Sequence, residues 1–212
     1  MTVAHQFDDA MQQHEAATLG MWTFLATEVL FFGGLFVSYA IYRYSYPGGF
    51  EFGSHQLHES FGAINTAVLL TSSLTVALCV HFAHEQKRRP AMLMLVATLV
   101  LGMAFLGIKG TEYFLEFRDH LIPAINFDVA PASGVEPRQV ELFMCFYFIM
   151  TLVHATHMLI GICALSFLLW RVSRKKYIGP HESTNTIEMV ALYWHFVDLV
   201  WIFLFPLLYL VK

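Results

Sequence analysis

Ionisable side chains lie inside several long apolar stretches of this sequence, and their spacing limits what they can do. His195 and Asp198 are three positions apart in the run YWHFVDLVW at residues 193–201. On a helix, that spacing places both on one face. Lys109 and Glu112 share the same spacing, so they can form an ion pair. A charge inside a membrane segment is costly and rarely faces lipid, so we expect both faces to be buried against other helices.

Glu28 is the most deeply placed carboxyl of the first apolar stretch. It lies about 10 residues into that stretch, which on a helix is roughly 15 Å from the start and near the bilayer centre. A carboxyl at that depth is protonated or hydrogen-bonded, because desolvation disfavours the charged form. Two interpretations stay open: a carboxyl that handles protons or lines a lipid cleft, and a neutral acid satisfied by a neighbouring helix.

His154 and His157 are also three positions apart, so both can reach one partner. Histidines in membrane helices are compatible with haem or metal ligation, and His195 could supply one more ligand. A bis-histidine haem needs ligands from two helices at matched depth, however, and a metal needs three or four ligands. We therefore favour hydrogen-bonded histidines in the core, and we expect no metal site and no catalytic residue in this chain.

The composition is that of a polytopic membrane protein. Of the 212 residues, 57% are hydrophobic and 13% are charged, so little chain remains for a soluble catalytic domain. A membrane span needs about 20 apolar residues. We predict an all-α bundle of five transmembrane helices forming a single domain over residues 1–212, with no nucleic-acid partner. The five helices are expected at about residues 18–42, 63–82, 91–114, 140–170 and 187–211.

The short loops predict the orientation of the chain. Seven basic residues fall on the side shared with the N-terminus: Lys87, Arg88, Arg89, Arg171, Arg174, Lys175 and Lys176. The opposite side has fewer: Arg43, Arg118, Arg138 and Lys212, with Lys109 near a helix end. The positive-inside rule then places the N-terminus in the cytoplasm and the C-terminus outside.

Two loops on the outer side differ in character. Residues 47–50 read Pro-Gly-Gly-Phe, which is typical of a turn. The second loop, at residues 116–139, is acidic. Its prolines at positions 123, 131 and 137 are expected to break any regular element.

Five segments, taken in order, carry a resemblance to a known family. They are residues 20–33 around Glu28, residues 65–73 (NTAVLLTSS), Glu112-Tyr113, residues 154–161 (HATHMLIG), and residues 193–201 with Glu188 upstream. Together they resemble subunit III of the haem-copper terminal oxidases, of the cytochrome c oxidase type, in a five-helix form. The resemblance covers about residues 16–116 and 142–209.

The chain departs from that family at several points. Many members have seven helices, and a V-shaped cleft that holds lipids separates the first two from the other five. Only the latter five are expected here. Lys109-Gly110 stands where many members have a glutamine and a small residue, and Ala155 replaces a common glycine. The outer loop at residues 116–139 is also extended.

The resemblance implies an accessory role. Subunit III carries no haem or copper, which reside in partner subunits. It packs against the catalytic subunit I, binds phospholipid, and sustains proton uptake and catalytic lifetime in aerobic respiration. The family's buried glutamate falls on Glu28, and its lipid-binding arginine falls on Arg171. The implied location is a bacterial plasma membrane.

Three other functions stay open. The chain could be subunit III of a quinol oxidase or of a relative associated with nitric-oxide reductase. It could be an independent proton or ion carrier that uses Glu28, Asp198 and the histidines. Inverted repeats and broken helices would favour a carrier, and the sequence has neither. It could also be a di-haem membrane cytochrome built on His154, His157 and His195.

Overall fold

All regular structure in the described part of the chain is α-helical. The computed structural model describes residues 10–125, 127–129, 134–174 and 182–210. Its helices, in chain order, are α1 (Ala10–Ser45), α2 (Pro47–His55), α3 (Glu59–His84), α4 (Arg88–Arg118), α5 (Pro137–Ser173) and α6 (Glu182–Tyr209). All except α2 are long and apolar enough to cross a membrane. The predicted all-α fold with five spans is confirmed.

The helices extend beyond the expected boundaries at most of their ends. The first was expected at residues 18–42, yet α1 begins at Ala10 and ends at Ser45. Hydropathy marks only the part of a helix that lies in hydrocarbon. Backbone hydrogen bonds between residues i and i−4 continue through the polar residues at both ends. Only the last helix stops earlier than expected, because α6 ends at Tyr209.

The turn expected at residues 47–50 and the break expected at Pro137 were wrong. Pro47 occupies the first turn of α2, and Pro137 occupies the first turn of α5, so neither breaks a helix. The amide that proline lacks has no partner in the first turn of any helix, and its fixed φ suits that position. The connection between α4 and α5 therefore runs over residues 119–136, which is shorter than expected.

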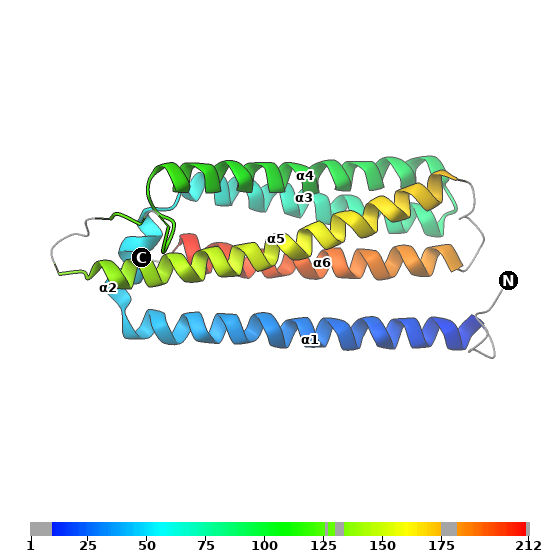
Figure 1. Ribbon diagram of the computed structural model, residues 1–212. Helices are drawn as coiled ribbons and strands as arrows, with labels where there is room; N and C mark the ends of the chain where they lie inside the picture. Colours follow the sequence, from blue (N-terminus) through cyan, green and yellow to red (C-terminus); the bar gives the residue numbers. More distant parts are fainter. Residues whose placement is uncertain (1–9, 126, 130–133, 175–181, 211–212) are drawn as a thin grey trace.

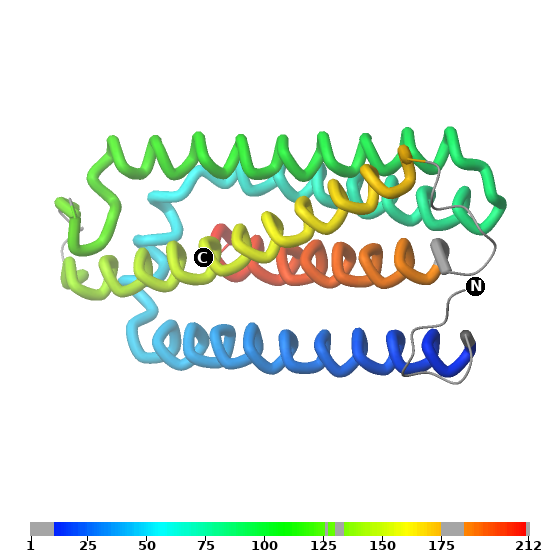
Figure 2. Tube along the Cα trace, turned by 45° about the vertical axis from the view of Figure 1, so that its right-hand side comes forward, coloured from blue at the N-terminus to red at the C-terminus, as the bar shows by residue number. Residues whose placement is uncertain are grey.

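The long helices lie side by side and form a bundle with one loosely attached member (Figure 1). Helix α3 packs most extensively against α4 and also against α6, while α5 packs against α4 and α6. Helix α1 runs along one edge and contacts mainly α6. It begins at the opposite end of the molecule from the point where α6 ends (Figure 2).

Small residues let aromatic rings into the bundle between helices. A Cβ atom added at Gly102 of α4 would lie 2.7 Å from Cη2 of Trp194, and one added at Gly161 of α5 would lie 2.9 Å from Cε3 of the same ring. The Trp194 side chain is fully buried. These two glycines therefore make room for a single tryptophan of α6 between α4 and α5, as is common at helix interfaces in membranes.

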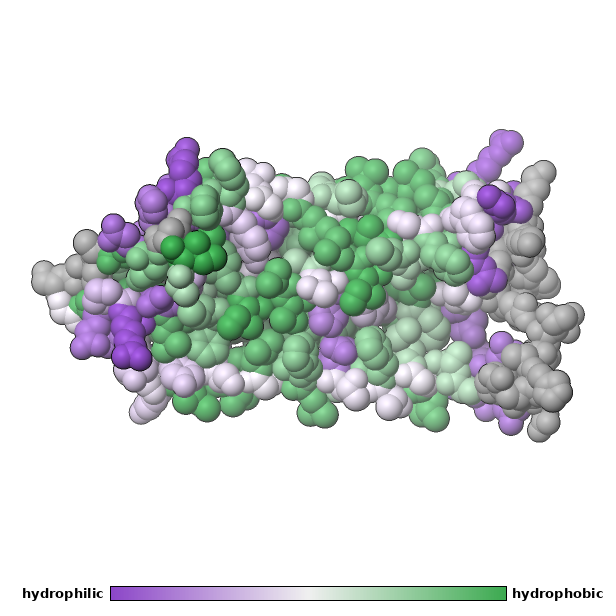
Figure 3. Space-filling model, viewed as in Figure 1, coloured by the Kyte–Doolittle hydropathy of each residue, from purple (hydrophilic) through white to green (hydrophobic). Residues whose placement is uncertain are grey.

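The outer surface has the polarity of a membrane protein. Hydrophobic side chains cover the middle of the face seen in Figure 3, and hydrophilic ones gather mainly at the two ends. At one end, Arg88 donates hydrogen bonds to the backbone carbonyls of Val172 and Ser173, at 2.7 and 2.6 Å. The two basic connections thus meet at the same end of the bundle. Nearby, a hydrogen bond from Lys87 lowers the pKa of the exposed Glu85.

The orientation in the membrane stays a prediction. Lys175, Lys176 and Lys212, three of the basic residues on which it rests, lie outside the described residues.

Candidate functional site: polar groups buried in the bundle

A lysine and a glutamate form a fully buried ion pair in α4. The Lys109 ammonium lies 2.9 Å from Oε2 of Glu112, and the two side chains are 3% and 0% exposed. The ammonium also donates to the hydroxyls of Tyr147 and Tyr209, at 2.8 and 2.5 Å. An ammonium has three N–H donors, so all three have acceptors. The pairing that the spacing of Lys109 and Glu112 predicts is present.

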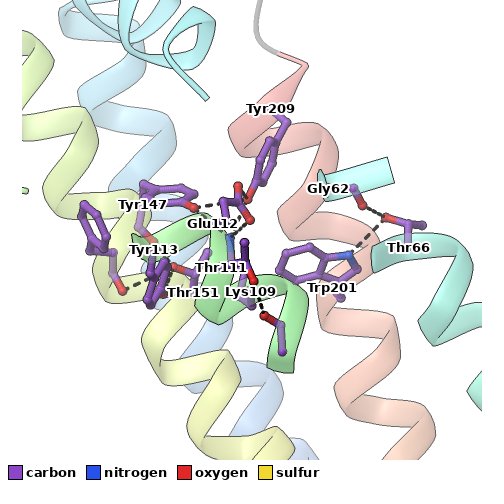
Figure 4. Close-up of polar contacts among 12 residues, drawn as sticks. Gly62, Thr66, Lys109, Thr111, Glu112, Tyr113, Tyr147, Thr151, Trp201 and Tyr209 are labelled. Atoms are coloured by element: carbon purple, nitrogen blue, oxygen red, sulfur yellow. Dashed lines mark hydrogen bonds and ion pairs between the residues drawn. The ribbon is translucent and has the colours of Figure 1, made fainter. Parts of the chain in front are cut away.

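Three helices contribute to this lysine cluster, which we define as Lys109, Glu112, Tyr147 and Tyr209 (Figure 4). The Tyr209 hydroxyl of α6 donates to Oε1 of Glu112 at 2.6 Å, so both carboxylate oxygens accept a hydrogen bond. The lysine nitrogen also lies 4.6 Å from the ring centroid of Tyr147, within range of a cation–π contact. The cluster therefore links α4 to α5 and α6 through fully satisfied polar groups.

A second carboxyl lies one helical turn beyond Glu112. Glu116 is 2% exposed, and neither of its oxygens forms a hydrogen bond with the described residues. Lys109 and Glu112 face it from α4, and Tyr147 faces it from α5 without reaching hydrogen-bonding geometry. Sequence reasoning missed Glu116, because it lies past the end of the apolar stretch. Its spacing of four from Glu112 and seven from Lys109 was the available signal.

Glu28 of α1 pairs with His157 of α5. Oε2 of Glu28 lies 3.0 Å from Nε2 of His157, and the side chains are 18% and 14% exposed. The other ring nitrogen, Nδ1, lies 2.8 Å from the backbone carbonyl of Val153. A carbonyl only accepts, so Nδ1 carries a hydrogen.

That assignment fixes the number of protons in the pair. With Nδ1 protonated, the contact between Nε2 and Glu28 is a hydrogen bond only if one further proton lies between them. The proton belongs either to a neutral Glu28 or to a charged His157, so in both cases the pair is neutral overall. Two phenylalanines of α1 lie beside the His157 ring, Phe32 at 5.2 Å and Phe31 at 6.4 Å between centroids. The arrangement can hold and exchange a proton.

His154 has different surroundings from His157. Its ring packs against those of Phe105 and Trp201, at centroid distances of 5.5 and 5.2 Å, and these two rings also contact each other at 4.9 Å. The side chain is 1% exposed, and neither ring nitrogen forms a hydrogen bond with the described residues. The two histidines therefore do not share one partner, although their spacing of three would allow it. The hydrogen bond favoured for His154 is not formed within the described part of the chain.

His195 and Asp198 lie on one face of α6, as their spacing predicts, and that face packs against α3. Nδ1 of His195 lies 2.7 Å from the Ser73 hydroxyl. Asp198 is 3% exposed, and although Ser72 and Ser73 face its carboxyl, neither of its oxygens has a hydrogen bond from the described residues. The expectation that both groups bond within the bundle is therefore met by His195 and not by Asp198.

Hydroxyls of α3 hold the two tryptophans of α6. The Trp194 indole nitrogen donates to the Ser72 hydroxyl at 3.0 Å, and that of Trp201 donates to Thr66 at 3.1 Å. Both indole rings are fully buried. The closing motif at residues 193–201 is thus an interface between α6 and α3.

The polar groups reported above do not form a metal site. Among the residues that the structure describes, no three side chains of His, Cys, Asp or Glu come close enough together to hold a metal ion. The three histidines each have different neighbours, so they do not come together at one point: His154, His157 and His195. Arg171, the expected lipid-binding residue, lies near the end of α5 with its guanidinium 5.7 Å from the Phe167 ring centroid. Its role stays a prediction.

Comparison with known proteins gives the family. The family model described as cytochrome c oxidase subunit III matches residues 3–119 and 132–212. Subunit 3 of the cytochrome bo(3) ubiquinol oxidase of Pseudomonas aeruginosa is 29% identical, over 98% of this chain and 91% of that protein. A probable quinol oxidase subunit 3 of Staphylococcus epidermidis is 28% identical, over 98% and 95%. Cytochrome c oxidase subunit 3 of Corynebacterium diphtheriae is 31% identical, over 96% and 92%. With its five apolar spans, this integral membrane protein belongs to the cytochrome c oxidase subunit III family.

Proposed function

We propose that this chain is the accessory subunit III of a proton-pumping haem-copper terminal oxidase in a bacterial plasma membrane. In this role it packs against subunit I, while haem and copper belong to partner subunits. The observation that carries the proposal is the family match over residues 3–119 and 132–212, on a bundle of five spans. The proposal accounts for polar groups that are buried in the membrane without forming a ligand set.

The pair formed by Glu28 and His157 is the part of the chain that we connect with proton uptake. It holds one proton in a hydrogen bond of 3.0 Å, and it joins α1 to the rest of the bundle. Both side chains are partly exposed at that edge, unlike the closed pair of Lys109 and Glu112. A proton held there can therefore exchange with groups of an adjoining subunit. Bound phospholipid is expected to contact Glu28 and Arg171.

The electron donor has two candidates. Cytochrome c is the donor that the family description names, and one relative is a cytochrome c oxidase subunit 3. A quinol is favoured by two other relatives, whose names are those of quinol oxidase subunits. Our leading proposal is the cytochrome c oxidase, and the quinol oxidase is the alternative.

Isolation of the native complex tests the proposal. The chain is purified from its own membrane in mild detergent, and the subunits and the optical spectrum are recorded. We expect co-purification with a subunit that carries haem and copper. Oxidation of reduced cytochrome c, compared with oxidation of ubiquinol by the same preparation, then identifies the donor. A colourless chain that purifies alone and transports ions would overturn the proposal.

The variant Glu28→Gln tests the proton-linked role within that complex. We expect normal assembly, because glutamine keeps the size of the side chain and one hydrogen bond to His157. Sustained turnover and proton uptake should fall, and the enzyme should inactivate sooner, because the amide cannot exchange a proton. Glu15→Gln, an exposed carboxyl on the same helix, is the matched control. Wild-type turnover, pumping and inactivation rate in Glu28→Gln would exclude the role.

A further inference from the structure

The lysine cluster and Glu116 together carry an unbalanced charge. Lys109 gives its three N–H donors to Glu112, Tyr147 and Tyr209, and Glu112 accepts at both oxygens. The cation and the first carboxylate therefore satisfy one another completely. Glu116 is a second carboxyl in the same buried space, and neither of its oxygens has a hydrogen bond from the described residues. If all three groups were ionised, the site would carry one uncompensated negative charge.

Such a charge is not stable in these surroundings. An ionised carboxylate buried without a partner is far more costly than a neutral acid, so the group takes up a proton instead. The titratable groups that face Glu116 are Lys109, Glu112 and Tyr113 of α4, Tyr147 of α5 and Tyr209 of α6. Only Lys109 is a cation among them, and its charge is already balanced by Glu112.

We propose that Lys109, Glu112 and Glu116 form an intramembrane proton-binding site that holds one exchangeable proton, with Glu116 as the residue that carries it. The site is separate from the pair of Glu28 and His157, and it lies close to the C-terminal end of α4. The proposal does not depend on the identity of the electron donor.

The position of Glu116 allows the proton to exchange. Glu116 lies two residues before α4 ends at Arg118. The neighbouring Phe117 is 51% exposed, and the Arg118 side chain is 69% exposed, so the buried carboxyl is within one helical turn of the surface. Tyr147 faces Glu116, and its hydroxyl already accepts from Lys109. That hydroxyl can turn its own hydrogen toward a carboxylate at Glu116.

Loss of the proton is coupled to the packing of three helices. Lys109 can neutralise only one carboxylate. When Glu116 ionises, either Lys109 turns toward it or Glu112 takes up a proton. Both events change the hydrogen bonds to Tyr147 of α5 and Tyr209 of α6. Protonation of this site and the contacts among α4, α5 and α6 are therefore linked.

Infrared difference spectroscopy on the purified complex tests the proposal. The C=O stretch of a protonated carboxylic acid is distinct from the bands of a carboxylate, and it shifts in deuterium oxide. Differences between wild type and each variant remove the contributions of all other carboxyls in the complex. We expect Glu116→Gln to lose one such band. Glu136→Gln, an exposed carboxyl before α5, serves as the control and should lose none.

Two further variants distinguish a shared proton from an isolated neutral acid. In Glu112→Gln, Glu116 becomes the only counter-charge for Lys109, so it should ionise, and the same band should disappear. In Lys109→Gln, both carboxyls must be neutral, so one band of similar area should be gained. If Glu116→Gln does not assemble, the band changes in Glu112→Gln and Lys109→Gln test the proposal instead. An unchanged band in Glu112→Gln, or no band to lose in Glu116→Gln, would overturn the proposal.

Discussion

Helix α1 and the bundle of α3 to α6 are held in place by different kinds of contact. A Cβ atom added at Gly20, Gly33 or Gly34 of α1 would meet nothing within 4 Å. At Gly102 and Gly161 of the bundle it would meet the Trp194 ring at 2.7 and 2.9 Å. The bundle is therefore close-packed at Gly102 and Gly161, although Gly107 and Gly110 of α4 face open space, as the three glycines of α1 do.

One apolar stripe of α1, which includes the buried Phe32, packs against the bundle, and two directional contacts add to it. Glu28 pairs with His157 at 3.0 Å, and the Tyr39 hydroxyl donates to the backbone carbonyl of Leu207 at 2.7 Å. The remaining surface carries large exposed side chains such as Leu30, which is 76% exposed. The bundle of α3 to α6 therefore forms the core of the protein. Helix α1 lies at the edge of this core, and we expect lipid or helices of a partner subunit to cover its exposed surface.

The largest effect is expected from removing the charge at the centre of the bundle. Lys109→Met leaves Glu112 buried without its cation, and breaking a buried ion pair on one side costs about 3–5 kcal/mol. We expect that loss in the free energy of unfolding, measured by detergent-driven unfolding in mixed micelles. Lys109→Gln should lose less, because the amide can still donate hydrogen bonds. Lys87→Met, whose side chain is 59% exposed, should change little. Equal losses for Lys109→Met and Lys87→Met would mean that the cluster does not stabilise the bundle.

Replacing one glycine in the bundle and one glycine in α1 by alanine tests the difference in packing directly. Gly161→Ala places a methyl group against the Trp194 ring, and overpacking of a core typically costs about 1–3 kcal/mol. Gly34→Ala on α1 has open space, so its stability should stay within about 1 kcal/mol of wild type, on the stabilising side. The same unfolding measurement applies to both. A destabilised Gly34→Ala would show that another part of the protein packs closely on α1.

The smallest effect on stability is expected where α1 meets α5. A double-mutant cycle of Glu28→Gln and His157→Gln should give a coupling energy of about 0.6 kcal/mol, the average for side-chain hydrogen bonds between membrane helices. The value is small because each group can find other partners when the contact is lost. A coupling energy as large as the loss in Lys109→Met would show that this pair stabilises the position of α1 as strongly as the lysine cluster stabilises the bundle.

Local patterns in the sequence predicted a substantial part of this structure. The five spans follow from runs of about 20 apolar residues. The pair of Lys109 and Glu112 follows from a spacing of three, because the helix itself brings the two side chains together. The burial of Trp194 and Trp201 also agrees with the sequence, since the stretch between them carries a histidine and an aspartate that should avoid lipid.

Other features could not be predicted from local patterns. Glu28 and His157 are 129 positions apart, and no spacing rule connects them. The helices are apolar on all sides, because lipid and the bundle core are both apolar, so hydropathy does not show which face of a helix is buried. For the same reason, nothing in the sequence indicated that Tyr147 and Tyr209 would both accept hydrogen bonds from Lys109.

The number of spans, the helical class of the fold, the family motifs and the ion pair of Lys109 and Glu112 could all be predicted from the sequence. Each of these depends on residues within a few turns of one another, or on composition. Only the tertiary structure decided which polar groups are satisfied. It gave Lys109 two tyrosines and Glu28 a histidine, and it left Glu116 and Asp198 buried without hydrogen bonds from the described residues. The physical reason is that hydrogen bonding between helices depends on their rotation and depth, which packing of the whole bundle sets.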